Sequence, residues 1–255
     1  MKAADVFMLM IFFFCGSIHS AYECIGLGET CTVAAALEVF NLRNAAYPFD
    51  WTISEYDSVC AALEDNFDKF LHPDFLSLRP DNHGVINKYG IVFVHDFPTT
   101  DYTGDLDIDA PLNEDILRQD WRDTLPEIQE KYARRIQRLR DVCSSNVKVY
   151  FIRHQGIQSR EQACTLRNII KKRYPKLDFT LVIVLSENES IEQWSEDNIK
   201  TYVVKQTAIW NDVAEWEIIF KDLGLIKEIS KRELQEKMNR YQKYEQFQGI
   251  EHETR

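Results

Sequence analysis

Strands and helices alternate through the second half of the chain, and this alternation limits the possible folds more than any other feature. Apolar runs predict strands at 147–152, 179–185 and 201–204, and amphipathic runs predict helices at 160–174 and 213–220. Parallel strands need long crossover connections, which helices supply. The order therefore predicts an α/β fold, with a mostly parallel sheet flanked by helices in three layers.

The composition of the 255-residue chain, 45% apolar and 28% charged, suits one globular domain. We expect this domain over 21–225, after a signal peptide over 1–20 and before a charged helix and tail over 226–255. The leader predicts an exported protein, whether periplasmic, luminal or secreted. The net charge of −11 argues against a nucleic-acid partner, and no segment after the leader reads as an integral membrane span.

Cys31 has the sequence context of a nucleophile. It follows an apolar strand at 22–27 and a Gly28-Glu29-Thr30 turn, and it opens a predicted helix over 32–40. Free backbone N–H groups and the macrodipole at a helix start favour a thiolate. His95, at the end of the strand-like run 89–95, is the natural base. Cysteines are also often buried, so a structural Cys31 remains an alternative.

The chain after residue 20 contains five cysteines, which is an odd number. Besides Cys31 they are Cys24, Cys60, Cys143 and Cys164. In an oxidising compartment at least one of the five thiols is unpaired, and such a thiol is a candidate reactive group. No paired-cysteine or HExxH motif supports a metal site, and we expect neither a metal nor a cofactor.

Basic residues offer a second kind of site. Pro126 fits the first turn of a helix over 126–143, whose polar face carries Arg134 and Arg138. Arg153 falls at the carboxyl end of a core strand, where open α/β sheets bind ligands. These arginines suggest an anion-binding or transferase-like protein with a structural Cys31. The alternatives are a solvated helix face and, for Arg153, an ion pair with an acidic residue.

Several connecting segments also have recognisable patterns. Ser54 is predicted to cap a helix that runs to about residue 70, and the pattern at 85–95 suggests a hairpin or two short strands. The acidic reach 97–113 reads as a solvated connection or an active-site lid. The tail from Ile226 reads as an amphipathic helix that docks on the body or on a partner protein.

The motifs together resemble an uncharacterised family of papain-like cysteine peptidases. The matching blocks, in chain order, are Leu27-Gly28 with Cys31, Leu42-Arg43, Tyr47-Pro-Phe-Asp-Trp51, Phe93-Val-His95-Asp-Phe97, Lys131 to Arg138, and Val149 to Arg153. The resemblance implies a hydrolase of peptides or small molecules, with Cys31 as nucleophile and His95 as base. The backbone N–H of Cys31 would be the first oxyanion donor.

A third group should orient His95, and Asp50 and Asp96 are the candidates. Neighbours on a strand point to opposite faces, so Asp96 would point away from His95, and we favour Asp50. Trp51, Asp96 and Arg153 are expected on the substrate side. The strand, glycine turn and nucleophile also resemble the start of small Gly-Asp-Ser esterases, with Cys31 near the serine position. An esterase therefore stays open as the reaction.

Overall fold

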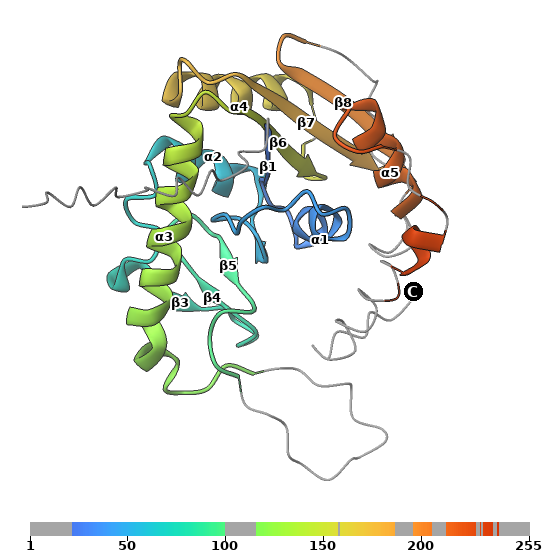
Figure 1. Ribbon diagram of the computed structural model, residues 1–255. Helices are drawn as coiled ribbons and strands as arrows, with labels where there is room; N and C mark the ends of the chain where they lie inside the picture. Colours follow the sequence, from blue (N-terminus) through green and yellow to red (C-terminus); the bar gives the residue numbers. More distant parts are fainter. Residues whose placement is uncertain are drawn as a thin grey trace, which may run out of the picture.

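A computed structural model describes residues 22–99, 116–157, 159–186, 196–205, 213–227, 230, 232–236 and 239 (Figure 1). The larger sheet has four strands in the order β1-β6-β7-β8, and every neighbouring pair is parallel. Its strands are β1 (Tyr22–Gly26), β6 (Lys148–His154), β7 (Phe179–Ser186) and β8 (Ile199–Val204). The predicted α/β fold with a parallel sheet and flanking helices is confirmed.

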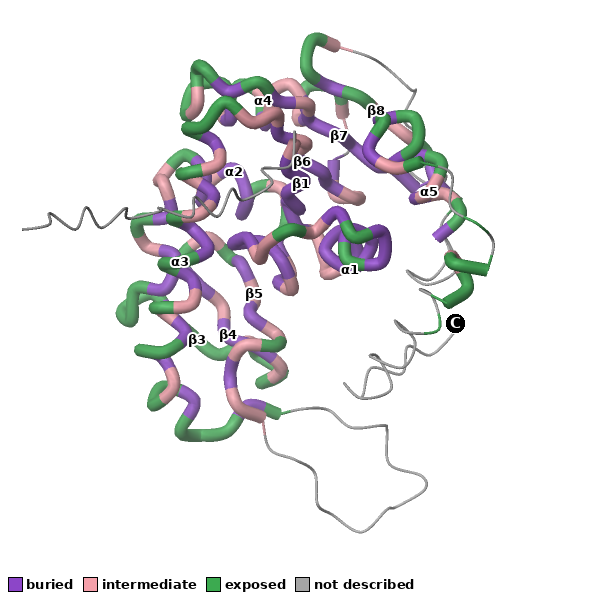
Figure 2. The backbone as a smooth tube through the Cα atoms, viewed as in Figure 1, coloured by how far each residue is buried: buried purple, intermediate pink, exposed green. Residues whose placement is uncertain are grey.

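Helices cover both faces of this sheet because strand residues alternate between two apolar clusters. Phe151 and Ile183 pack in the larger cluster, whereas Ile152 and Val184 pack in the other. The larger cluster includes residues of α2 (Tyr56–Glu64), α3 (Leu125–Cys143) and α4 (Arg160–Arg173). The smaller cluster includes residues of α1 (Thr32–Val39) and α5 (Val213–Asp222). The strands between them are largely buried (Figure 2).

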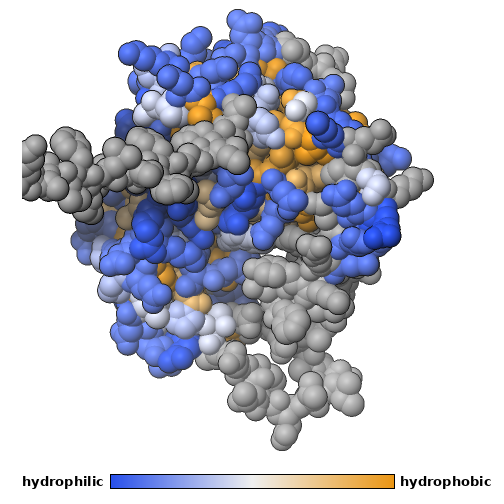
Figure 3. Space-filling model, viewed as in Figure 1, coloured by the Kyte–Doolittle hydropathy of each residue, from blue (hydrophilic) through white to orange (hydrophobic). Residues whose placement is uncertain are grey.

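The face of the larger sheet that packs against α1 and α5 is covered less fully by the described residues. Tyr22, Tyr150 and Tyr202 lie on this face and are only half-buried. In the space-filling view, most of the visible surface is hydrophilic, and an apolar patch lies near the position of β7 and α5 (Figure 3). Leu234 of the tail packs against this cluster, as expected for a docking helix, whereas a partner protein for the tail stays a prediction.

A small antiparallel sheet lies between the first helix and α3 in the chain. Its strand order is β2-β5-β4-β3, with β2 (Thr52–Ile53), β3 (Ser77–Leu78), β4 (Val85–Ile86) and β5 (Val92–Phe93). Two short 3-10 helices, η1 (Pro73–Phe75) and η2 (Trp121–Thr124), complete the described elements. The predicted hairpin over 85–95 is confirmed, but its second strand stops at Phe93, and His95 lies in a bend.

The predicted cap at Ser54 is wrong. Helix α2 begins at Tyr56 after Glu55, and the fully buried Ser54 instead shares a hydrogen bond with Thr52. The helix ends at Glu64 rather than near residue 70, because Asn66 and Phe67 take positive φ angles that an α-helix excludes.

Some predictions fall outside the described residues. They concern the leader over 1–20 and most of the acidic reach 97–113, which stay predictions together with export and the domain limits. Among the helices that the structure describes, none is both long enough and apolar enough to pass through a membrane.

Candidate active site

Cys31 is the N-cap residue of α1, as its sequence context predicts. Cys31 is half-buried. Its carbonyl oxygen accepts the first hydrogen bond of the helix, from the Ala35 N–H at 2.9 Å. Of the other four described cysteines, Cys24, Cys60 and Cys143 are buried, and Cys164, on α4, is half-buried like Cys31. None of these five cysteines forms a disulfide. Cys31 is therefore partly accessible to solvent and lies at the helix end that favours negative charge.

The turn before Cys31 is held in one shape by left-handed backbone and strand-like pairing. Gly28 has φ +75°, and a Cβ at this position would lie 2.6 Å from Ser54 Cβ, so only glycine fits. Glu29, at φ 64°, exchanges backbone hydrogen bonds with Ser54, at 3.2 Å and 3.0 Å. The turn is thus tied to the end of β2.

The segment that carries His95 lies at the edge of β2 opposite to the edge that the Glu29 turn occupies. Thr52 of β2 is paired with Phe93 of β5, two residues before His95. The Cys31 turn and the His95 bend therefore flank the same short strand, on opposite edges. Neighbouring strands are spaced about 4.8 Å apart, which places the backbone at Glu29 roughly 10 Å from that of β5. Side chains can meet across that distance when both point over the same face.

Trp51 lies against His95. Their ring centroids are 6.5 Å apart and the rings are edge to face, at 79°. Arg43 places its guanidinium 5.8 Å from the centroid of the Trp51 ring. His95 itself is exposed, and Trp51 is half-buried with φ 63°. The Tyr47 to Trp51 motif thus brings its tryptophan to the predicted base.

Asp50 is buried beside the start of α1. Its side chain is 2% exposed, and Oδ2 accepts hydrogen bonds from the Tyr47 backbone N–H at 3.0 Å and from Arg43 Nε at 3.1 Å. A Cβ on Gly26 would lie 3.3 Å from Asp50 Oδ1. Burial raises the pKa of Asp50, although Arg43 and the Tyr47 N–H act in the opposite direction.

Asp96 points to α3. Its carboxylate is 3% exposed and accepts hydrogen bonds from Lys131 Nζ at 2.6 Å and from the Tyr132 hydroxyl at 2.7 Å. Burial, and then the Asp96 carboxylate, raises the pKa of Tyr132, which keeps the hydroxyl protonated as the donor. These two hydrogen bonds anchor Asp96, the residue after His95, to the long helix α3.

Residues 22–189 match the family described as "Putative papain-like cysteine peptidase (DUF1796)". The chain belongs to this family. The match extends from β1 beyond the end of β7 and includes Cys31, Asp50, His95 and Arg153. The resemblance drawn from the motifs is confirmed. A search of curated proteins and a search of solved structures each found no match.

Arg153 lies at the carboxyl end of β6, as the sequence predicts, but its partners are groups of the protein itself. It is fully buried at the end of β6, and its guanidinium contacts the Leu27 and Ser54 carbonyl oxygens and the Glu29 carboxylate. The ion pair that the sequence left open is therefore present. Substrate contact by Arg153 would require the Glu29 turn to move.

Several arginines of α3 also form contacts within the protein, whereas a solvated helix face predicts that their side chains lie in water. Arg138 donates to the Ala46 carbonyl oxygen at 2.5 Å, and Arg140 donates to the Asn66 carbonyl oxygen at 2.8 Å. Arg135 is buried against the Tyr132 ring, 4.8 Å from its centroid. Arg134 is exposed and lies 3.5 Å from Glu130. Arg138 therefore contacts the backbone at Ala46, whereas Arg153 contacts the backbone at Leu27 and Ser54.

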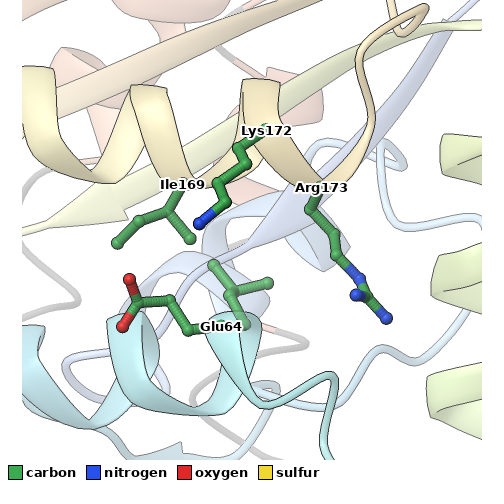
Figure 4. A pocket seen from close by; sticks show the side chains of 5 residues that line it. Glu64, Ile169, Lys172 and Arg173 are labelled. Carbon is green, nitrogen blue, oxygen red and sulfur yellow. The ribbon is translucent and has the colours of Figure 1, made fainter.

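The described residues line cavities that include the following two. One, of about 370 Å³, lies between the residues that follow His95 and the first half of α3, and its lining includes Asp96, Phe97 and Lys131. The other, of about 180 Å³, lies between α2 and α4, where Lys172 and Glu64 face each other and Arg173 points away (Figure 4). Only the first adjoins the segment that carries His95. No group of three metal-ligating side chains occurs among the described residues.

Glu29 and Ser54 are the site residues that sequence reasoning missed. The sequence shows Glu29 only as part of a turn, and its pattern predicts Ser54 as a helix cap. A single acidic residue before the cysteine gives no signal of its partner, because Arg153 is 124 residues away along the chain. Ser54 contributes through its backbone, which carries no sequence signature.

Proposed function

We propose that this protein is a cysteine hydrolase in which Cys31 is the nucleophile and His95 the general base. The single observation that carries the proposal is the position of Cys31, half-buried at the start of α1, with the His95 bend on the opposite edge of the strand to which its turn is tied. Membership of the papain-like cysteine peptidase family supports the same chemistry.

The reaction proceeds in two transfers. His95 takes the proton of the Cys31 thiol, and Sγ forms a bond to the carbonyl carbon of an amide or ester. The bond from that carbon to the nitrogen or oxygen then breaks, and the imidazolium returns the proton to the amine or alcohol. Water next attacks the thioester, with His95 accepting its proton and then giving it to the departing thiolate. The products are a carboxylic acid and an amine or alcohol.

The remaining roles follow from the neighbours of these two residues. The backbone N–H of Cys31 is the proposed oxyanion donor. Asp50 is the proposed orienting group, because it lies beside Gly26 and precedes Trp51, which contacts His95. Trp51 and the cavity beside Asp96 offer surface for the substrate. The hydrogen bonds of Asp96 with Lys131 and Tyr132 suit a residue that fixes the His95 segment.

The test is alkylation of the full chain by iodoacetamide, with each labelled cysteine quantified by peptide mass mapping. Cys164 is the matched internal control, because among the cysteines that the structure describes it is the other half-buried one. We expect Cys31 to label at least tenfold faster than Cys164 near pH 6, where a free thiol is almost wholly protonated. His95→Ala should remove this advantage. Equal rates at Cys31 and Cys164 in the unaltered protein would overturn the proposal.

A further inference from the structure

The guanidinium of Arg153 joins three segments that meet at the Cys31 turn. Nη1 donates to the Leu27 carbonyl oxygen at 2.8 Å and to the Ser54 carbonyl oxygen at 3.0 Å. Nη2 donates to the carboxylate of Glu29. Leu27 leads out of β1, Glu29 is two residues before Cys31, and Ser54 ends the β2 segment. One buried side chain thus bonds both sides of the turn that leads into α1.

The position of Arg153 is energetically demanding. The residue is 0% exposed, and burial lowers the pKa of its guanidinium, while the nearby Glu29 carboxylate favours the charged form. Nε has no hydrogen-bond partner among the described residues. A buried cation is tolerated when several acceptors satisfy it, and here two carbonyl oxygens and a carboxylate do so. All three acceptors belong to the Cys31 turn or to the strand to which it is tied.

The loop after β6 is shaped around the same ion pair. Gly156 has φ +70°, and a Cβ at this position would overlap Glu29 Oε2 and would lie 2.6 Å from Arg153 Nη2. Glycine is therefore required both by the backbone angle and by the approach of the pair. The ion pair is enclosed between the turn at 27–31 and the loop that follows His154.

We propose that Arg153 and Glu29 are positioning residues that fix the turn at 27–31 and so hold Cys31 at the start of α1 facing the His95 segment. This inference rests on the proposed function. Planar, multidentate hydrogen bonding distinguishes arginine from lysine, so a lysine at position 153 would keep the charge and lose the geometry. Small misplacements of a catalytic group reduce rates by as much as about 100-fold.

Two charge-conserving substitutions test the inference. Arg153→Lys removes the forked contact in the core, and Glu29→Asp shortens the carboxylate arm at a position that is 25% exposed. Aspartate tolerates the left-handed backbone angle of residue 29 better than glutamate, so this variant is expected to fold. Arg140→Lys is the matched control, since Arg140 also donates to a backbone carbonyl oxygen, at Asn66, away from the Cys31 turn.

The readout is the alkylation rate of Cys31 divided by that of Cys164 in the same sample, between about pH 6 and pH 9. We expect Glu29→Asp and Arg153→Lys to lower this ratio at least tenfold near pH 6, with less effect near pH 9, and Arg140→Lys to leave it unchanged. Circular dichroism identifies the folded variants. A merely structural role would expose both thiols together and would not change the pH profile of Cys31.

The outcomes separate this inference from the proposed function. If Cys31 is not fast in the unaltered protein, the hydrolase proposal fails. If Cys31 is fast there and equally fast in folded Glu29→Asp, the hydrolase stands and the positioning role is overturned. Should Arg153→Lys not fold, the Glu29→Asp result decides alone.

Discussion

Trp51 and His95 lie edge to face, with their ring centroids 6.5 Å apart. This contact links the Tyr47 to Trp51 motif with the His95 motif, which are far apart in the chain but adjacent across β2 and β5. An edge-to-face pair contributes about 0.5–1.5 kcal/mol beyond its buried area, which is enough to restrict the orientation of an exposed imidazole.

Replacing Trp51 should therefore change the environment of His95 more than that of the other described histidines. In Trp51→Ala we expect the proton NMR shifts of the carbon-bound imidazole protons of His95 to change, because the ring current of the indole is lost. His72, which stacks near Phe75 with centroids 5.2 Å apart, provides an internal control. Equal spectra for His95 in both proteins would contradict the contact.

Gly28 should be far less replaceable than Gly224, although both have positive φ angles near 70°. Gly28→Ala would place a methyl group 2.6 Å from Ser54 Cβ, whereas Gly224→Ala meets nothing within 4 Å. We expect a loss of about 2–4 kcal/mol in the free energy of unfolding for Gly28→Ala, from overpacking added to backbone strain. Gly224→Ala should lose only about 1–2 kcal/mol. Urea unfolding measures both, and similar losses would contradict the close approach of the turn to Ser54.

His154 should make the protein less stable in mild acid. Burial, with a smaller effect of Arg153, lowers its pKa from 6.5 to about 4, and its ring lies 5.8 Å from that of Trp216. Between these two values the unfolded chain binds more protons than the folded protein, so the free energy of unfolding falls as the pH is lowered. The contribution is complete above about pH 6.5, and at most about 3 kcal/mol is lost by pH 4.

The comparison protein is His154→Phe, which keeps an aromatic ring against Trp216 and cannot titrate. We expect urea unfolding of the unaltered protein to show a steeper loss of stability between pH 6.5 and pH 4 than unfolding of this variant. Other acid-sensitive groups are common to both proteins and cancel in the difference. Parallel curves would show that His154 does not resist protonation in the folded state.

The sequence was most informative where the pattern is local. Alternating apolar strands and amphipathic helices predicted the parallel sheet, because a crossover connection leaves few other arrangements. The position of Cys31 at a helix start was also predictable, since a glycine turn and an alanine-rich run define it within about ten residues. The His95 strand was predicted too long because two pairing residues were enough for this small sheet.

Long-range electrostatic partners were not predictable in the same way. The sequence shows Arg153 at the end of an apolar strand, which suits either a ligand or an ion pair, and the choice depends on where the Glu29 turn folds back. Similarly, the arginines of α3 repeat with the period of a solvated face. Whether Arg138 and Arg140 reach backbone carbonyl oxygens depends on the segments at Ala46 and Asn66, which the helix sequence does not encode.

The two buried acids beside the site should respond differently to neutralisation. Asp50→Asn removes the charge that faces Arg43, at a side chain only 2% exposed, and Asp96→Asn removes the charge that faces Lys131 and Tyr132. Leaving a fully buried cation without its partner costs up to about 3–5 kcal/mol, and the cost is smaller here because Arg43 is 18% and Lys131 40% exposed, so both variants should unfold at lower urea concentrations. The proposed orienting role belongs to Asp50, however, and this predicts a difference in thiol reactivity.

We expect Asp50→Asn to slow the alkylation of Cys31 near pH 6 about as much as His95→Ala, because an imidazole without its orienting acid is a poorer base. Asp96→Asn should reduce stability with a much smaller effect on this rate. Both alkylation rates are measured without urea, at a temperature at which circular dichroism shows a folded protein. Cys164 is the internal reference. The opposite pattern, a reactive thiol in Asp50→Asn and an unreactive one in Asp96→Asn, would transfer the orienting role to the acid next to His95.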